Sequence, residues 1–254
     1  MEDEPVAYVL CSNPRSGTTL LCDMLARTGV AGRPDSFFRQ KSLQDWCVDW
    51  GLQGPPDPAD PAFTRRYLDA MRAEGRGDTP VFGLRLMGGD LRFACDWLGR
   101  EYPGQGTAQA LFDAAFGPTR FIHLSRQDKL AEAVSYARAE QSGLWHQRPD
   151  GSALEQLDPT APEGFDAGRL HALVHELRGY DDAWNRWFTV EGIAPLRLTY
   201  ETLSADPQLV LAQVLAFIGQ DPGRAKAVSP GTRKLADATS ADWTARYRAA
   251  FPEG

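Results

Sequence analysis

Short apolar runs alternate along the chain with longer segments whose apolar residues recur every three or four positions. The runs predict buried strands at 7–11, 81–87, 120–124 and 195–200. Helical patterns begin near Thr18, Asp128 and Leu209, and the longest extends from Leu170 to Phe188. Strands separated by helices pair in parallel, so the pattern predicts an α/β fold, a three-layer sandwich with a central parallel sheet. Ligands of such sheets collect at the carboxyl ends of the strands.

Three segments rich in proline and glycine interrupt this alternation, near 51–63, 102–108 and 147–168. Prolines at this density remove backbone donors and fix φ, so the segments are predicted as loops. The third has the length of a lid or a binding loop. No internal repeat is visible, and we predict a single domain over 1–254 that carries these three insertions.

The charge of the chain restricts its partners. With 27 Lys and Arg against 34 Asp and Glu, the formal net charge is −7, so we expect no general attraction to nucleic acid or to an anionic membrane. The acidic start and the shortness of the apolar runs predict neither a signal peptide nor a membrane span, and hence a cytoplasmic protein. The four cysteines form no C-x-x-C pair, so structural thiols and no metal are expected. Any bound anion needs a local site.

Residues 13–19, Asn-Pro-Arg-Ser-Gly-Thr-Thr, stand between the first predicted strand and its helix. A tight turn at a helix N-terminus gathers backbone N–H groups, and Arg15 adds a full charge, which favours phosphate binding. The loop differs from a Walker A loop because Gly17 is followed by threonine instead of lysine. A capped turn without a ligand is the alternative, since Ser and Thr are common helix caps.

Three segments in order resemble the sulfotransferases that use 3′-phosphoadenosine 5′-phosphosulfate (PAPS). Residues 14–21 resemble their 5′-phosphosulfate loop. Residues 121–126, followed by 133–135, match the strand-Arg and helix-Ser pattern that grips the 3′-phosphate. Residues 198–203 with 206–207 and 215–219 are similar to the late Tyr-Glu-x-Leu, Asp-Pro and Phe-Leu-Gly segments. This resemblance implies a P-loop nucleotide-binding type of fold.

Within that superfamily the sequence is most similar to the bacterial trehalose 2-sulfotransferase-like group. The similar segments are 29–38, 83–87, 182–188 and 236–248, so the likeness spans the chain from Tyr8 to Tyr247. It is weakest at 39–79 and 147–167, where loops that shape the acceptor site are expected. A homodimer is implied by the family likeness alone.

The resemblance assigns two anion sites to a donor that is charged at two separated places. The residues that the resemblance assigns to cofactor binding are Arg15, Ser16, Gly17, Thr18, Thr19, Arg126, Ser135 and Lys234. Arg15 is also expected to be catalytic, by stabilising the leaving phosphate of the product adenosine 3′,5′-bisphosphate. For Lys234, a solvated surface pair with Arg233 is an equal alternative. No metal is required in this family.

The acceptor side departs from the family pattern. The family has carboxylates on both sides of Pro34 where this chain has Arg33 and Ser36, so we nominate Asp35 as catalytic base, with Asp90 as the alternative. Expected to contact the acceptor are Arg33, Ser36, Phe37 and Arg85. Nearby Trp46 and Trp50 either line an acceptor pocket or pack under the first loop. The new cation argues against trehalose and for an anionic or carbonyl-rich acceptor.

The sequence therefore predicts transfer of a sulfuryl group from PAPS to a hydroxyl of a carbohydrate or small secondary metabolite by in-line displacement. A catalytically degenerate PAPS- or nucleotide-binding protein is the competing hypothesis, because the family carboxylates are missing. A nucleoside triphosphate-dependent kinase is disfavoured by the absent Walker lysine.

Overall fold

The computed structural model describes residues 7–148, 150–231 and 237–252. Its centre is a parallel sheet in the order β2-β1-β3-β6, formed by β1 (Ala7–Ser12), β2 (Phe82–Met87), β3 (Thr119–Ser125) and β6 (Leu196–Thr199). Each strand begins and ends within one residue of the sequence prediction. Ala7 pairs with Phe82 on one side and with Thr119 on the other, so the carboxyl ends of these strands align along one edge.

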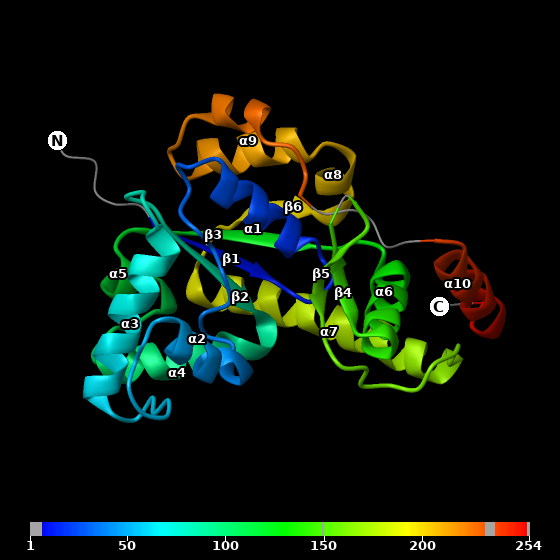
Figure 1. Cartoon of the computed structure of the whole chain (residues 1–254), viewed down its shortest axis with the longest axis horizontal. Coiled ribbons are helices and arrows are strands. Elements are labelled where there is room, and N and C mark those ends of the chain that lie inside the picture. The colour runs from blue at the N-terminus through cyan, green and yellow to red at the C-terminus, as the bar shows by residue number, and fades with distance from the viewer. Residues whose placement is uncertain (1–6, 149, 232–236, 253–254) are drawn as a thin grey trace.

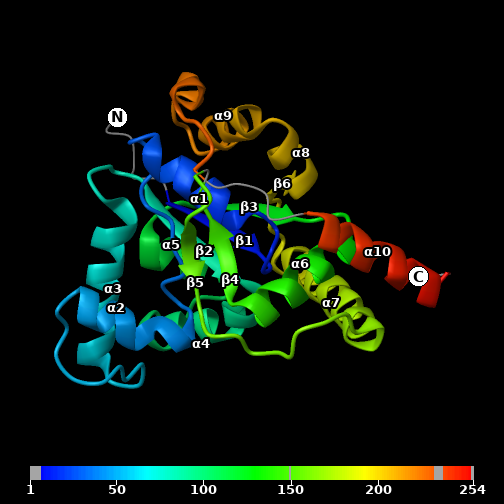
Figure 2. The same cartoon turned by 45° about the vertical axis from the view of Figure 1, so that its right-hand side comes forward.

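Helices cover both faces of the sheet (Figures 1 and 2). One face carries α1 (Thr18–Arg27), α8 (Tyr200–Ala205) and α9 (Pro207–Phe217). The other carries α2 (Leu43–Asp49), α3 (Pro61–Arg76), α4 (Leu91–Glu101), α5 (Ala108–Phe116) and α7 (Ala167–Glu191). Alternate residues of β1 serve the two cores: Tyr8 and Leu10 pack toward α1, and Val9 packs toward α7 and α5. The predicted three-layer α/β sandwich is confirmed.

A third cluster extends the molecule beyond the sheet. Helices α6 (Lys129–Ser142) and α10 (Ala238–Ala250) pack against the first half of α7, with Val134, Leu173 and Trp243 among the buried residues. Figure 1 shows α10 at the far side of α6 from the sheet. Short 3₁₀ turns complete the described elements: η1 (Gln40–Ser42), η2 (Gly88–Asp90) and η3 (Pro222–Ala227).

Regular structure reaches into all three predicted insertions, although in 102–108 it is only Ala108, the first residue of α5. In 51–63, α3 already begins at Pro61, because the Asp60 carboxylate caps it through the N–H groups of Ala62 and Phe63. The third insertion contains β5 (Ala153–Gln156), which forms an antiparallel hairpin with β4 (Leu144–Gln147) just before it. The prediction of a loop from 147 was wrong at β5. Both strands are short and partly exposed, so no continuous apolar run marks them in the sequence. The hairpin lies in front of the sheet, between its carboxyl edge and α6 (Figure 2).

Candidate functional site

The loop between β1 and α1 is built to leave backbone donors facing outward. Arg15 has a φ of 68°, the one positive φ among the described non-glycine residues, and Gly17 follows with 89°. No side chain caps the first turn of α1. Left-handed residues next to a helix N-terminus turn successive N–H groups toward one point, which makes an anion nest. The left-handed backbone at Arg15, which is costly for a residue with a side chain, makes this loop the first candidate for a ligand site.

Ser16 supports the loop from inside. Its side chain is fully buried, and its hydroxyl donates to the Asn13 carbonyl at 2.7 Å. Ser12 beside it donates to the Leu124 carbonyl at 2.6 Å and so fixes the loop to β3. The expected ligand contact of Ser16 is therefore left to its backbone N–H, whereas Gly17, Thr18 and Thr19 line cavities.

A buried polar network holds the same loop from the side of α6 and α7. The Asn13 amide donates to Asp181 at 2.8 Å, and Lys129 bridges Asp181 at 2.6 Å and Glu132 at 2.7 Å. Glu132 is fully buried, and this burial raises its pKa to about 7. The loop is thus fixed to both helices through Asn13.

The two expected anion-binding arginines converge on this loop. Arg15 Nε donates to Ser135 Oγ at 3.0 Å, and its Nη1 donates to the Trp145 carbonyl. Burial, and then the nearby Arg126, lower the Arg15 pKa to about 10, which leaves it cationic at neutral pH. Arg126 Nη1 donates to the Arg15 carbonyl at 3.4 Å, and its guanidinium lies 4.3 Å from the centroid of the Tyr200 ring. Its Nε is buried without a partner among the described atoms, as expected of a donor kept for a ligand.

Two cavities open on either side of the loop. The first has a volume of about 590 Å³ and is lined by Arg126, Ser135, Arg138 and Tyr200 among others. The second has a volume of about 480 Å³ and includes Thr18, Thr19, Ser36 and Arg85. Four residues line both: Arg15, Gly17, Trp145 and His146. A group bound at the loop is therefore reachable from both cavities.

Arg85 organises the wall of the second cavity. Its guanidinium donates to Thr19 Oγ1 at 3.2 Å, to Ser36 Oγ at 2.8 Å and to Asp35 Oδ1 at 2.7 Å. Asp35 Oδ1 also accepts the N–H of Ser36 at 2.6 Å. Asp35 lines neither cavity, and its carboxylate holds Arg85 in place. The sequence nomination of Asp35 as base stays a prediction.

Two other expected acceptor contacts lie elsewhere. The Phe37 ring is fully buried, 5.1 Å from the Trp46 ring centroid and 5.9 Å from that of Trp50. Arg33 pairs with Asp78 at 3.5 Å, beside the end of α3, and lines neither cavity. Both assignments are corrected: Phe37 belongs to the core and Arg33 faces the exterior. Trp46 and Trp50 are partly buried and pack against that core, the second of the two alternatives. Lys234 lies outside the described residues.

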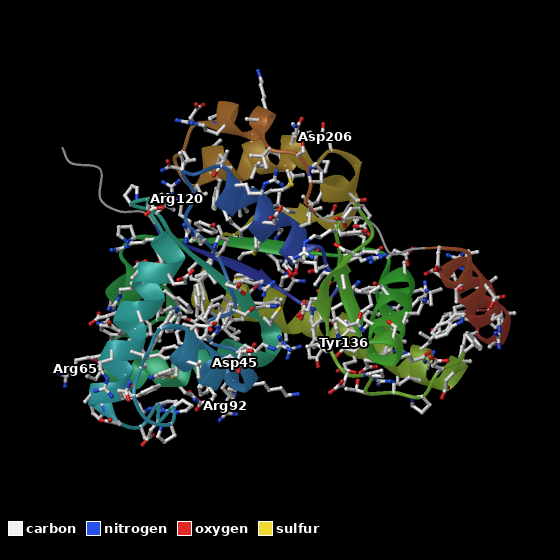
Figure 3. The ribbon with its side chains drawn as sticks, in the orientation of Figure 1. Asp45, Arg65, Arg92, Arg120, Tyr136 and Asp206 are labelled. Atoms are coloured by element: carbon white, nitrogen blue, oxygen red, sulfur yellow. The ribbon has the colours of Figure 1, made fainter. Side chains whose placement is uncertain are left out.

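The hairpin supplies site residues that sequence reasoning missed. His146 Nε2 lies 3.0 Å from Thr19 Oγ1 and 3.4 Å from Glu155 Oε2, and Trp145 packs 5.5 Å from Tyr136 of α6. Burial, with Arg15 and Arg85 nearby, lowers the pKa of His146 to about 3, so the ring is neutral. Figure 3 labels Tyr136 near this hairpin, whereas Arg65 lies at the opposite end of the molecule. The Asp150-Gly151 pair is typical of a hairpin turn and was the sequence signal that could have indicated this hairpin.

The described part of the chain shows no group of three His, Cys, Asp or Glu side chains placed to hold a metal ion. Its four cysteines, Cys11, Cys22, Cys47 and Cys95, are free thiols. None of its helices combines the length and the apolar character that crossing a membrane requires.

Known proteins resemble this chain over nearly its full length. It is 31% identical over 270 residues to the trehalose 2-sulfotransferase of Mycolicibacterium smegmatis, covering 98% of this chain and 96% of that protein. The trehalose 2-sulfotransferase of Mycobacterium tuberculosis is 31% identical over 265 residues, covering 96% and 95%. A solved sulfotransferase domain of the Synechococcus olefin synthase covers 98% of this chain and 95% of that one, with 20% identity and a TM-score of 0.47.

The sequence profile of one family matches the residues that form the sheet, the loop after β1 and the walls of both cavities. The match extends over residues 7–250, and the description of that family is Stf0 sulphotransferase. The resemblance stated from the motifs is thereby confirmed, and the chain belongs to the Stf0 sulfotransferase family.

Proposed function

We propose that the protein transfers a sulfuryl group from PAPS to a hydroxyl of a carbohydrate or a small secondary metabolite. The observation that carries this proposal is the meeting of two cavities at Arg15 and Gly17. A donor that reaches the loop from the first cavity exposes its terminal group to an acceptor in the second. Displacement in line needs this arrangement of entering and leaving groups.

The first cavity fits a donor with two separate anionic groups. The backbone nest and Arg15 serve the 5′-phosphosulfate, and Arg126 with Ser135 serves the 3′-phosphate. The support is the pair of cations in an acidic protein, together with the unpartnered Nε of Arg126. During transfer, negative charge grows on the bridging oxygen, and the Arg15 guanidinium stabilises it as the phosphate leaves.

The second cavity receives the acceptor. Tyr136, Tyr180 and Trp145 give it flat aromatic surface, and Arg39 and Lys41 give it positive charge. Aromatic rings with a few placed polar groups suit a sugar ring or an aromatic metabolite. The two relatives are named for trehalose, but Ser36, which lines this cavity, replaces a family carboxylate here, so we propose a different acceptor.

Calorimetric titration tests the donor assignment. We expect tight binding of adenosine 3′,5′-bisphosphate without magnesium and weak binding of ATP-magnesium; the reverse order would overturn the proposal. Transfer is then measured with ³⁵S-labelled PAPS against trehalose, glucose and a panel of phenolic and aliphatic alcohols. Binding without transfer to any of them would favour the degenerate binding protein, the reading that the missing family carboxylates support.

A further inference from the structure

Where the family pattern has a carboxylate, this chain has Ser36, whose hydroxyl does not take up a proton at neutral pH. Ser36 faces the acceptor cavity, and its hydroxyl already accepts a hydrogen bond from Arg85 Nε at 2.8 Å. Asp35 beside it is held by the same guanidinium at 2.7 Å. Attack by a hydroxyl nevertheless needs a group that removes its proton. The other carboxylates of the cavity are therefore the candidates for this role.

Among the described residues, three carboxylates line the acceptor cavity: Asp90, Glu155 and Glu176. Glu176 accepts the hydroxyl of Tyr180 at 2.6 Å, on the α7 wall. Asp90 lies beside Arg39 at the start of α4. Glu155 alone of the three lies on the hairpin, whose residues Trp145 and His146 line both cavities. It is therefore the carboxylate placed beside the point where the two cavities meet.

The hairpin fixes Glu155 at that point. Glu155 pairs with His146 across the two strands, which places both side chains on one face of the hairpin. Glu155 Oε2 lies 3.4 Å from His146 Nε2, and His146 lines both cavities. The hydrogen bond of His146 Nε2 is with Thr19 Oγ1 at 3.0 Å, and it anchors the ring to the first turn of α1. The Glu155 carboxylate lies beside this anchored, neutral ring.

We propose that Glu155 is the catalytic base of the transfer and that His146 is the residue that positions it. This inference rests on the proposed function. The acceptor O–H bond breaks as its proton passes to a Glu155 oxygen, and the acceptor oxygen forms the new bond to sulfur. The bond from sulfur to the 5′-phosphate oxygen breaks, and its electron pair stays on that oxygen beside Arg15. The proton then leaves to water, because the Glu155 side chain is 37% exposed.

The test compares Glu155→Gln with Glu163→Gln, the same change at an exposed residue of the same insertion that lines neither cavity. Turnover is measured with labelled PAPS and the best acceptor of the panel, and also as acceptor-free hydrolysis of PAPS, in which water is the nucleophile. We expect E155Q to lower kcat roughly 10²- to 10⁴-fold and to lose the acid limb of the pH profile. Adenosine 3′,5′-bisphosphate binding stays within threefold, and E163Q behaves as the unchanged protein.

A second variant guards against misfolding of the hairpin. Glu155→Asp keeps a carboxylate on the same strand, and we expect at least tenfold more turnover than in E155Q. Equal rates in E155Q and E163Q would overturn the inference, as would loss of turnover in Asp90→Asn with E155Q active. These outcomes differ from failure of the proposed function, in which the unchanged protein neither binds adenosine 3′,5′-bisphosphate nor consumes PAPS.

Discussion

The guanidinium of Arg126 lies over the ring of Tyr200, with 4.3 Å between its central carbon and the ring centroid. This contact joins the end of β3 to the start of α8 and holds the cation flat against the wall of the first cavity. Because a stacked guanidinium has lost most of its rotational freedom, it binds an anion at a small further entropic cost.

Replacing Arg126 with alanine is expected to act on the 3′-phosphate selectively. A charge-assisted hydrogen bond contributes about 2 to 3 kcal/mol, which is roughly 30- to 150-fold in Kd. Calorimetry should show this loss for adenosine 3′,5′-bisphosphate and a much smaller one for adenosine 5′-phosphate. Arg92→Ala, at an exposed residue near the start of α4 that lines neither cavity, is the control. Equal losses for both nucleotides would contradict the assignment.

The Asp35→Asn variant separates orientation from catalysis. Asparagine keeps an oxygen that accepts from Arg85 and Ser36, so Arg85 retains its contact with Ser36 and Thr19. We expect kcat to fall less than tenfold, with the acid limb of the pH profile kept. Loss of turnover with unchanged nucleotide affinity would return the role of base to Asp35. The rate and its pH profile are measured together with labelled PAPS.

The strands were predictable because β1, β2 and β3 are almost wholly buried, so continuous apolar runs mark them. The phosphate loop was predictable because its chemistry is local to residues 13–19. The acceptor side of the site was not predictable in this way. Ser36 reaches the cavity while its neighbour Phe37 points into the core, and a change of one position reverses the direction of a side chain. Glu155 reaches the site only through the pairing of β4 with β5, a hairpin of two short, partly exposed strands that no continuous apolar run marks.

Gly17 is a position where the loop tolerates no side chain. A Cβ there would lie 2.8 Å from Cδ2 of Tyr200, and its φ of 89° disfavours any L residue. Gly29 is the matched control, since its φ of 68° carries the backbone cost with nothing within 4 Å. We expect Gly29→Ala to cost about 1 kcal/mol and Gly17→Ala about 2 to 4 kcal/mol of unfolding free energy. Denaturant titration compares them, and equal losses would show that Tyr200 moves aside freely.

His146 gives the protein a stability that depends on pH. Its pKa is about 3 in the folded chain against 6.5 for a free imidazole, because burial disfavours the charged ring and Arg15 and Arg85 repel it. A group with a depressed folded pKa stabilises fully above its unfolded pKa and loses that contribution as pH falls. By pH 5 the loss reaches about 2 kcal/mol.

The measurement is the difference in unfolding free energy between the unchanged protein and His146→Gln at pH 7.5 and at pH 5. Glu132, whose pKa burial raises to about 7, changes stability in the opposite direction over this range. Its contribution is present in both proteins and cancels in the difference. We therefore expect the advantage of histidine over glutamine to shrink by about 2 kcal/mol on acidification. A difference that stays constant with pH would mean that the ring of His146 is solvated, and that the hairpin does not close over Thr19.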